Sequence, residues 1–274
     1  MVNIVNPNIL INGDFQVWQR GISFNKVTTN SYFADMWNVG MSISSPNDTP
    51  PTISKSDSGI NIAYGSTKNI TMTQFLEKYL IYNENYTLTI GVGGDIYSYN
   101  IIGGTSFSSA VTPFLNIDYE VFNNPGGTRS YDCISFTLTS SMTINFVKLE
   151  RGTKFTGNIP RRYDEELRLC QRYYYKLPYG QYVCGSDSGG SIYIHDPWII
   201  NNMAGTSRSI INGITSSCGL KYNGIDSGGT IKQMGYAYNA IQMTFNEVAP
   251  ISTTVYFYYG SENQYIGVEA YNWY

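Results

Sequence analysis

Charged side chains are scarce in this chain. Asp, Glu, Lys and Arg together make up 14% of its 274 residues, compared with about 25% in a typical soluble domain. The net charge is −3, and the densest basic pair, Arg161-Arg162, is closely followed by the acidic run Asp164 to Glu166. Wide contact with nucleic acid requires clustered Lys and Arg, which displace the counterions of the phosphates. The composition therefore argues against a nucleic-acid partner.

Long apolar runs are missing as well. No window approaches the ~18 consecutive apolar residues of a membrane span. Met1 to Leu10 has neither the basic stretch nor the apolar core of a signal peptide. We therefore expect a protein that is made in the cytosol without inserting into a membrane. If it acts outside the cell, it leaves by lysis or on a particle.

The chain has only four cysteines and one histidine. Cys133, Cys170, Cys184 and Cys218 lie far apart without C-x-x-C spacing, which predicts buried thiols rather than a disulfide framework. The histidine, His195, has no nearby Cys or paired acids for a zinc site, and no G-x-S-x-G serine for a catalytic triad. We expect it to be a loop or interface residue.

One pair of acids keeps an enzymatic alternative open. Asp118 and Glu120 alternate in Ile117-Asp-Tyr-Glu-Val121, which puts both carboxylates on one face of a strand. Glycoside hydrolysis needs two carboxylates about 5 to 9.5 Å apart, but a solvated strand face explains the same pattern equally well. We expect a protein that is not an enzyme, with glycan hydrolysis as the alternative.

Aromatic residues, by contrast, are abundant: they make up 15% of the chain, with 25 Tyr and 12 Phe. Tyr fits the half-buried surface of a β-sheet, and it also brings apolar area with a hydroxyl to subunit contacts. Several segments are rich in β-branched and aromatic residues and are separated by Gly, Asn, Ser and Pro clusters; they include residues 86–90, 133–138, 142–147 and 253–259. Such short strands predict an all-β chain built from sandwiches.

One segment breaks the strand pattern. Residues 163–176 carry acids at their start, bases toward their end and apolar residues at three- and four-residue spacing, as in an amphipathic helix bounded by prolines. We therefore predict a domain over residues 1–160, a linker helix over 161–176 and a C-terminal β-sandwich over 177–274. A shorter helical turn is expected at Gln74 to Leu80.

The second half also contains a weak internal repeat. Residues 185–192 and 224–231 each place a D-S-G-G sequence before a β-branched run. We interpret the two as turns of corresponding hairpins, because each offers one carboxylate, too few oxygen ligands for a calcium loop.

Four ordered blocks of sequence extend over residues 8 to 175. The opening block is Asn8-Ile-Leu-Ile-Asn-Gly-Asp-Phe-Gln-Val-Trp-Gln-Arg-Gly21, followed by Tyr32-Phe-Ala-Asp-Met-Trp37. Gln74-Phe-Leu-Glu77 then precedes the strand Tyr86-Thr-Leu-Thr-Ile90. The half closes with Val147-Lys-Leu-Glu-Arg-Gly152, Pro160-Arg-Arg-Tyr163 and Glu165-Glu-Leu-Arg-Leu-Cys-Gln-Arg-Tyr-Tyr174. In this order the blocks resemble a large group of bacteriophage tail-fibre and baseplate proteins, with Met36 where Arg is common.

This resemblance implies a jelly roll in the first half, like those of carbohydrate-binding modules. It also implies a homotrimer on a virion or on a headless phage-derived particle, in contact with other tail or baseplate proteins. In related sugar-binding jelly rolls an acid follows the N-G-D-F sequence and helps to hold calcium, whereas this chain has Gln16 there. We expect no cofactor and leave a structural calcium ion at Asp14 and Glu150 as an alternative.

Sugar binding requires aromatic rings that stack on pyranoses, together with amides or acids for the hydroxyls. Trp18 and Trp37 lie in the scaffold blocks, so we expect them in the core. The candidates in the variable half are Asp196, Trp198 and Asn201, together with Tyr271 and Trp273 of the tail. Packing between subunits would explain these residues as well.

The sequence thus predicts a phage tail-fibre or receptor-binding protein, which binds a host cell-surface polysaccharide as a trimer. Three weak sites on one tip would act together through multivalency. The alternatives are a purely structural baseplate or collar protein, a glycan hydrolase, and a free carbohydrate-binding module of a cell-wall enzyme.

Overall fold

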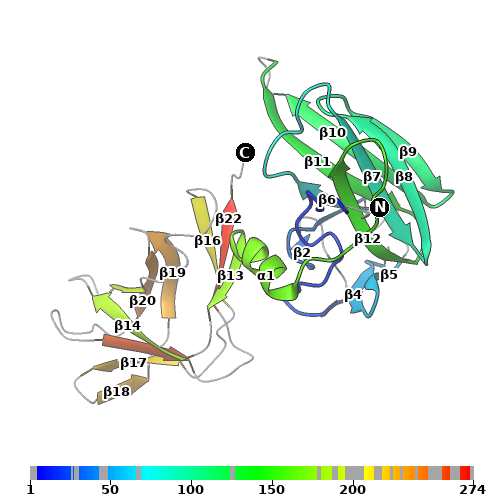
Figure 1. Cartoon of the computed structure of the whole chain (residues 1–274). Coiled ribbons are helices and arrows are strands. Elements are labelled where there is room, and N and C mark those ends of the chain that lie inside the picture. The colour runs from blue at the N-terminus through cyan, green and yellow to red at the C-terminus, as the bar shows by residue number, and fades with distance from the viewer. Residues whose placement is uncertain are drawn as a thin grey trace. The chain divides into compact units, whose positions relative to one another are not determined.

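The computed structural model describes residues 5–25, 27, 31–42, 49–65, 69–123 and 127–177, and beyond these the strands β14 to β22. The chain divides into two compact units, residues 1–170 with Tyr274, and residues 171–273 (Figure 1). The division falls inside the segment 161–176, where the sequence predicts a linker.

The first unit is built from two antiparallel sheets of six strands each. The sheet that we call sheet A comprises, in spatial order, β1 (Ser23–Phe24), β4 (Thr52–Ser56), β5 (Gly59–Ala63), β12 (Met142–Arg151), β7 (Asn85–Val92) and β8 (Asp95–Ile102). Sheet B comprises β2 (Ser31–Tyr32), β3 (Asn38–Ser42), β6 (Asn69–Phe75), β11 (Arg129–Leu138), β10 (Leu115–Asn123) and β9 (Phe107–Thr112). The all-β fold class that the sequence predicts is confirmed.

The core lies between the two sheets because side chains alternate along each strand. In β6, Ile70, Met72 and Gln74 are buried, whereas the residues between them are only half-buried. The core combines apolar residues of both sheets with aromatic rings of the N-terminal segment. Trp18 and Trp37, which are 8% and 0% exposed, belong to this core as predicted.

Late strands are inserted between early ones in both sheets. In sheet A, β12 lies between β5 and β7, and in sheet B, β11 lies between β6 and β10. This pairing of the end of the unit with its beginning is the wound arrangement of jelly-roll sandwiches. The register of sheet B therefore depends on contacts between residues that are far apart in the sequence.

The helix α1 is shorter than the sequence predicts. It spans Tyr163–Gln171, with the acids in its first turn, and the chain then enters the strand β13 (Tyr174–Leu177). The prediction of helix up to residue 176 is wrong because consecutive tyrosines favour strand and β13 pairs with the last strand of the chain. Within the described residues, no helix has the length and apolar character needed to cross a membrane.

The predicted helical turn at Gln74 to Leu80 is also absent. The strand β6 runs through Phe75, and residues 76–80 form no helix. The amide of Gln74 explains the difference, because it faces inward and exchanges two hydrogen bonds with the backbone of Ile11.

The second unit consists of strands among its described residues after Tyr173. The strand β13 joins β22 (Ile266–Tyr271) and β16 (Ser207–Asn212) in a three-stranded sheet. A seven-stranded sheet comprises, in spatial order, β18 (Ile225–Gly228), β17 (Cys218–Tyr222), β21 (Val255–Tyr259), β14 (Gly180–Ser186), β15 (Ser191–Ile194), β20 (Ala240–Phe245) and β19 (Ile231–Ala237).

The seven-stranded sheet must curl over on itself. Its two edge strands are β18 and β19, yet only residues 229 and 230 separate Gly228 from Ile231. Three peptide units span at most about 11 Å, so the two edges of the sheet approach each other at this point. The β-sandwich predicted for this half stays a prediction.

The first D-S-G-G sequence, residues 187–190, and Gly229 of the second lie outside the described residues. The interpretation of the repeat as equivalent turns therefore stays a prediction.

Replacing Phe136 by Ala should destabilise the first unit strongly. The ring of Phe136 is fully buried, and its centroid lies 5.5 Å from that of Trp37. A large-to-small change at such a site costs about 3–5 kcal/mol, measurable by urea unfolding. The control Phe114→Ala, at a position that is 56% exposed, should change the unfolding free energy by no more than about 0.5 kcal/mol. Equal effects of the two changes would contradict the assigned core.

Candidate functional site

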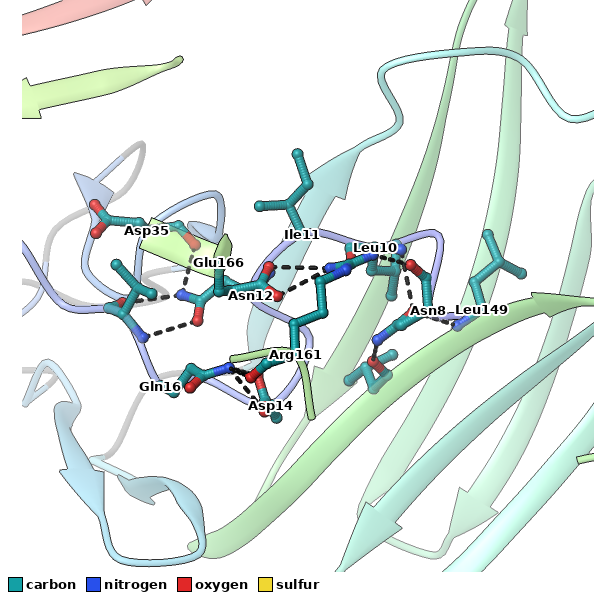
Figure 2. Close-up of polar contacts among 12 residues, drawn as sticks. Asn8, Leu10, Ile11, Asn12, Asp14, Gln16, Asp35, Leu149, Arg161 and Glu166 are labelled. Carbon is teal, nitrogen blue, oxygen red and sulfur yellow. Dashed lines mark hydrogen bonds and ion pairs between the residues drawn. The ribbon is translucent and has the colours of Figure 1, made fainter. Parts of the chain in front are cut away.

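The opening, middle and closing sequence blocks meet in one partly buried polar network (Figure 2). The side chain of Asn8 donates to the carbonyl oxygen of Val147 and accepts from the backbone N–H of Leu149, at 2.9 and 3.0 Å. The side chain of Asn12 accepts from the N–H of Val17 and donates to the carbonyl oxygens of Val17 and Asp35, all at 2.9 Å. These contacts join the opening block to the segment around Asp35 and to β12.

An ion pair joins the opening block to the helix α1. The guanidinium of Arg161 donates to the carboxylate of Glu166 at 2.9 Å and to the carbonyl oxygens of Leu10 and Asn8 (Figure 2). Glu166, which is 1% exposed, also accepts from the backbone N–H of Asn12. The start of α1 is therefore fixed to the N-terminal segment.

This network is structural in character. Its charged and amide groups are satisfied by neighbouring backbone, and the pocket beside Arg161 and Glu166 offers about 10 Å³ to the centre of a water molecule, which is room for about one water. A sugar ring does not fit there. We conclude that the recognised blocks specify the scaffold rather than a ligand site.

The acids of the calcium alternative have separate partners. Glu150 is fully buried, 3.2 Å from the ammonium nitrogen of Lys148, and accepts from the N–H of Thr156. Asp14 accepts from the amide of Gln16. Burial raises the pKa of Asp14, and the charge of Glu166 raises it further. No group of three metal-ligating side chains occurs among the residues that the structure describes, so the calcium alternative gains no support.

The sugar-binding residues predicted from the sequence lie almost entirely outside the described part. Asp196, Trp198, Asn201 and Trp273 fall outside the described residues, as does His195. Tyr271 is the last residue of β22, where its backbone pairs with that of Ser207. These assignments therefore stay predictions.

Sheet B presents a face of mixed polar and aromatic character on the side opposite the core. Because side chains alternate along a strand, the residues between the core positions of β3, β6, β11 and β10 share this side. We call this set the outer face; it comprises Asn38, Thr71, Thr73, Phe75, Asn116, Asp118, Glu120, Phe122, Tyr131, Cys133, Ser135 and Thr137.

Three aromatic rings form a cluster at one end of the outer face. Phe122 and Tyr131 are cross-strand partners whose rings stack with centroids 4.5 Å apart. Phe75 on the next strand meets Tyr131 edge to face at 5.2 Å. Phe122 is 37% exposed, so part of this residue remains accessible to solvent.

Two carboxylates lie beside this cluster. Asp118 and Glu120 share the outer face, opposite Ser135 and Cys133 of β11, as the alternation in the sequence predicts. Burial raises the pKa of Glu120, and the charge of Asp118 raises it further, while a hydrogen bond from Ser135 lowers it. The thiol of Cys133 is not a nucleophile at neutral pH, because burial in the first place raises its pKa to about 12.

The outer face has the chemistry that binds a sugar. An aromatic ring offers an apolar surface, carboxylates accept strong hydrogen bonds from hydroxyl groups, and the Thr and Ser hydroxyls can both donate and accept. The acids were visible in the sequence because they alternate within five residues. The aromatic cluster was not, because its three rings come from segments that only the strand register brings together.

The buried pair Arg161–Glu166 should matter far more than the neighbouring exposed pair. Glu166→Ala leaves the guanidinium of Arg161 without its carboxylate, a change that costs about 3 kcal/mol. Asp164→Ala removes the partner of Arg162 from a pair in which both side chains are more than half exposed, so its expected cost is below about 1 kcal/mol. Thermal and urea unfolding of the two variants would test this difference. A similar loss of stability in both would show that the network does not hold α1.

Comparison with known proteins gives no assignment beyond this geometry. No protein-family model matches the chain, and no curated protein or solved structure is significantly similar to it. The functional argument therefore depends on the residues of the outer face and on the sequence blocks.

Proposed function

We propose that this protein is a non-enzymatic receptor-binding protein of a bacteriophage tail fibre or a phage-like particle. It binds a host cell-surface carbohydrate through the outer face of sheet B. The observation that carries the proposal is the combination on one sheet face of the aromatic cluster Phe75, Tyr131 and Phe122 with the carboxylates Asp118 and Glu120.

The shape of this surface favours a polymer over a small metabolite. Pockets for small molecules enclose most of the ligand, whereas the outer face is the surface of a sheet, exposed at Asn116 and Phe122 and buried at Cys133 and Ser135. A polysaccharide lies along such a surface and makes repeated weak contacts. Several copies on one particle then give high avidity without a tight single site.

The sequence blocks support the setting of this activity. Their resemblance to phage tail-fibre and baseplate proteins favours assembly in the host cytoplasm, incorporation into a virion tail, and contact with other tail proteins. The same resemblance and the many tyrosines favour a homotrimer. The C-terminal candidates Asp196, Trp198, Asn201, Tyr271 and Trp273 belong to this proposal as a second contact region, with either sugar or neighbouring subunits.

Phe122→Ala and Tyr131→Ala should each weaken glycan binding. Each change removes ring surface from the proposed site, and loss of one aromatic contact worth about 0.5–1.5 kcal/mol lowers the affinity by roughly two- to twelve-fold. A bacterial glycan array followed by affinity measurements would show this loss. Phe114→Ala removes an exposed ring that is not part of the outer face and should bind like the wild type. Unchanged binding by both site variants would rule out the outer face as the receptor site.

The purified chain should be a trimer, and mass photometry at nanomolar to micromolar concentration would measure this directly. A monomer over this range would contradict the trimeric assembly.

A trimer that binds no glycan on the array would favour the purely structural baseplate or collar protein. Release of fragments from a bound polysaccharide would favour the hydrolase, for which Asp118 and Glu120 are the available acids.

A further inference from the structure

We infer that the outer face selects glycans without negative charge and rejects polysaccharides that carry carboxylate, phosphate or sulfate groups. This inference rests on the proposed function and names the class of ligand for the same site. It depends on the negative charge of the two acidic side chains as well as on the aromatic rings.

The charge of the outer face has one sign. Asp118 and Glu120 are the only Asp, Glu, Lys or Arg residues among its described strand positions. The electrostatic influences on Glu120 are its burial, the negative charge of Asp118 and the hydrogen bond from Ser135. Among the described residues, neither Asp118 nor Glu120 takes part in an ion pair.

The two carboxylates and the ring lie in one row. Asp118, Glu120 and Phe122 occupy alternate positions of β10, so the row from the first to the last is about 13 Å long. A glycan chain that contacts the exposed part of Phe122 and follows the strand therefore meets both carboxylates.

Carboxylates determine which partner groups are acceptable along this row. An ionised carboxylate only accepts hydrogen bonds, which suits the hydroxyl groups of an uncharged sugar and makes these bonds strong. An anionic group on the glycan has no proton to donate and meets a like charge.

The experiment compares two glycans that differ only in charge. The uncharged polysaccharide that binds best on a bacterial glycan array is oxidised at its primary alcohols to carboxylates, and both forms are titrated against the intact protein. We expect the oxidised form to bind the wild type at least about tenfold more weakly because its carboxylates are repelled. A tenfold loss corresponds to about 1.4 kcal/mol. In 1 M NaCl, where screening extends over only about 3 Å, the two affinities should approach each other.

Two variants identify the residues responsible. Asp118→Asn combined with Glu120→Gln keeps the shape of both side chains and removes both charges, so the ratio of the two affinities should fall toward one. Binding of the uncharged form should weaken at the same time, because neutral acceptors form weaker hydrogen bonds. Asp95→Asn removes an exposed charge from sheet A and should leave the ratio at its wild-type value.

The possible outcomes separate this inference from the proposed function. Preferred binding of anionic glycans by the wild type, or an unchanged ratio in the double variant, overturns the charge selection while leaving glycan binding intact. The absence of binding to any glycan overturns the proposed function, and the inference with it. A ratio that changes in the double variant but not in Asp95→Asn supports both.

Discussion

The insertion of β11 between β6 and β10 is the constraint on which the rest of the first unit depends. This one strand fixes the register of two neighbours that are separated from each other by about forty residues of sequence (75 to 115). It directs Ile134 and Phe136 into the core and Tyr131, Cys133 and Ser135 to the opposite side. A shift of the register by one residue would exchange the two sets, removing the core and the aromatic cluster together.

The sequence blocks hold the scaffold of the first unit together and do not form a ligand site. Residues such as Asn8, Asn12, Gln74 and Arg161 are buried or half-buried, and their polar atoms bond to backbone groups far along the chain. Each side chain supplies a hydrogen-bond partner to a backbone group. Without these side chains, the irregular N-terminal segment would leave such backbone groups unsatisfied. Their identity is therefore constrained by the fold, and the pattern tells more about the scaffold than about the ligand.

The sequence predicted those parts of the structure that depend on patterns within one short segment. Alternation predicted the strands and placed Asp118 and Glu120 on one face, and the blocks placed Trp18 and Trp37 in the core. The end of α1 was predicted wrongly because the tyrosines after it are compatible with both helix and strand. Pairing with β22 decides for strand. The grouping of Phe75 with Tyr131 was not predictable, because nothing within either segment encodes their register. The helical turn expected near Gln74 failed for the same reason: the partner of its amide, Ile11, lies 63 residues away.

Alternate residues of β10 have different surroundings. One set packs in the core, and the other set lies on the outer face. Its inward residues, Leu115, Ile117 and Tyr119, are at most 1% exposed, while Asn116, Asp118 and Glu120 between them are excluded from the core. Each outward position can therefore change without altering packing between the sheets. In the proposed receptor-binding role, single substitutions at these positions would change the preferred host while the framework persists.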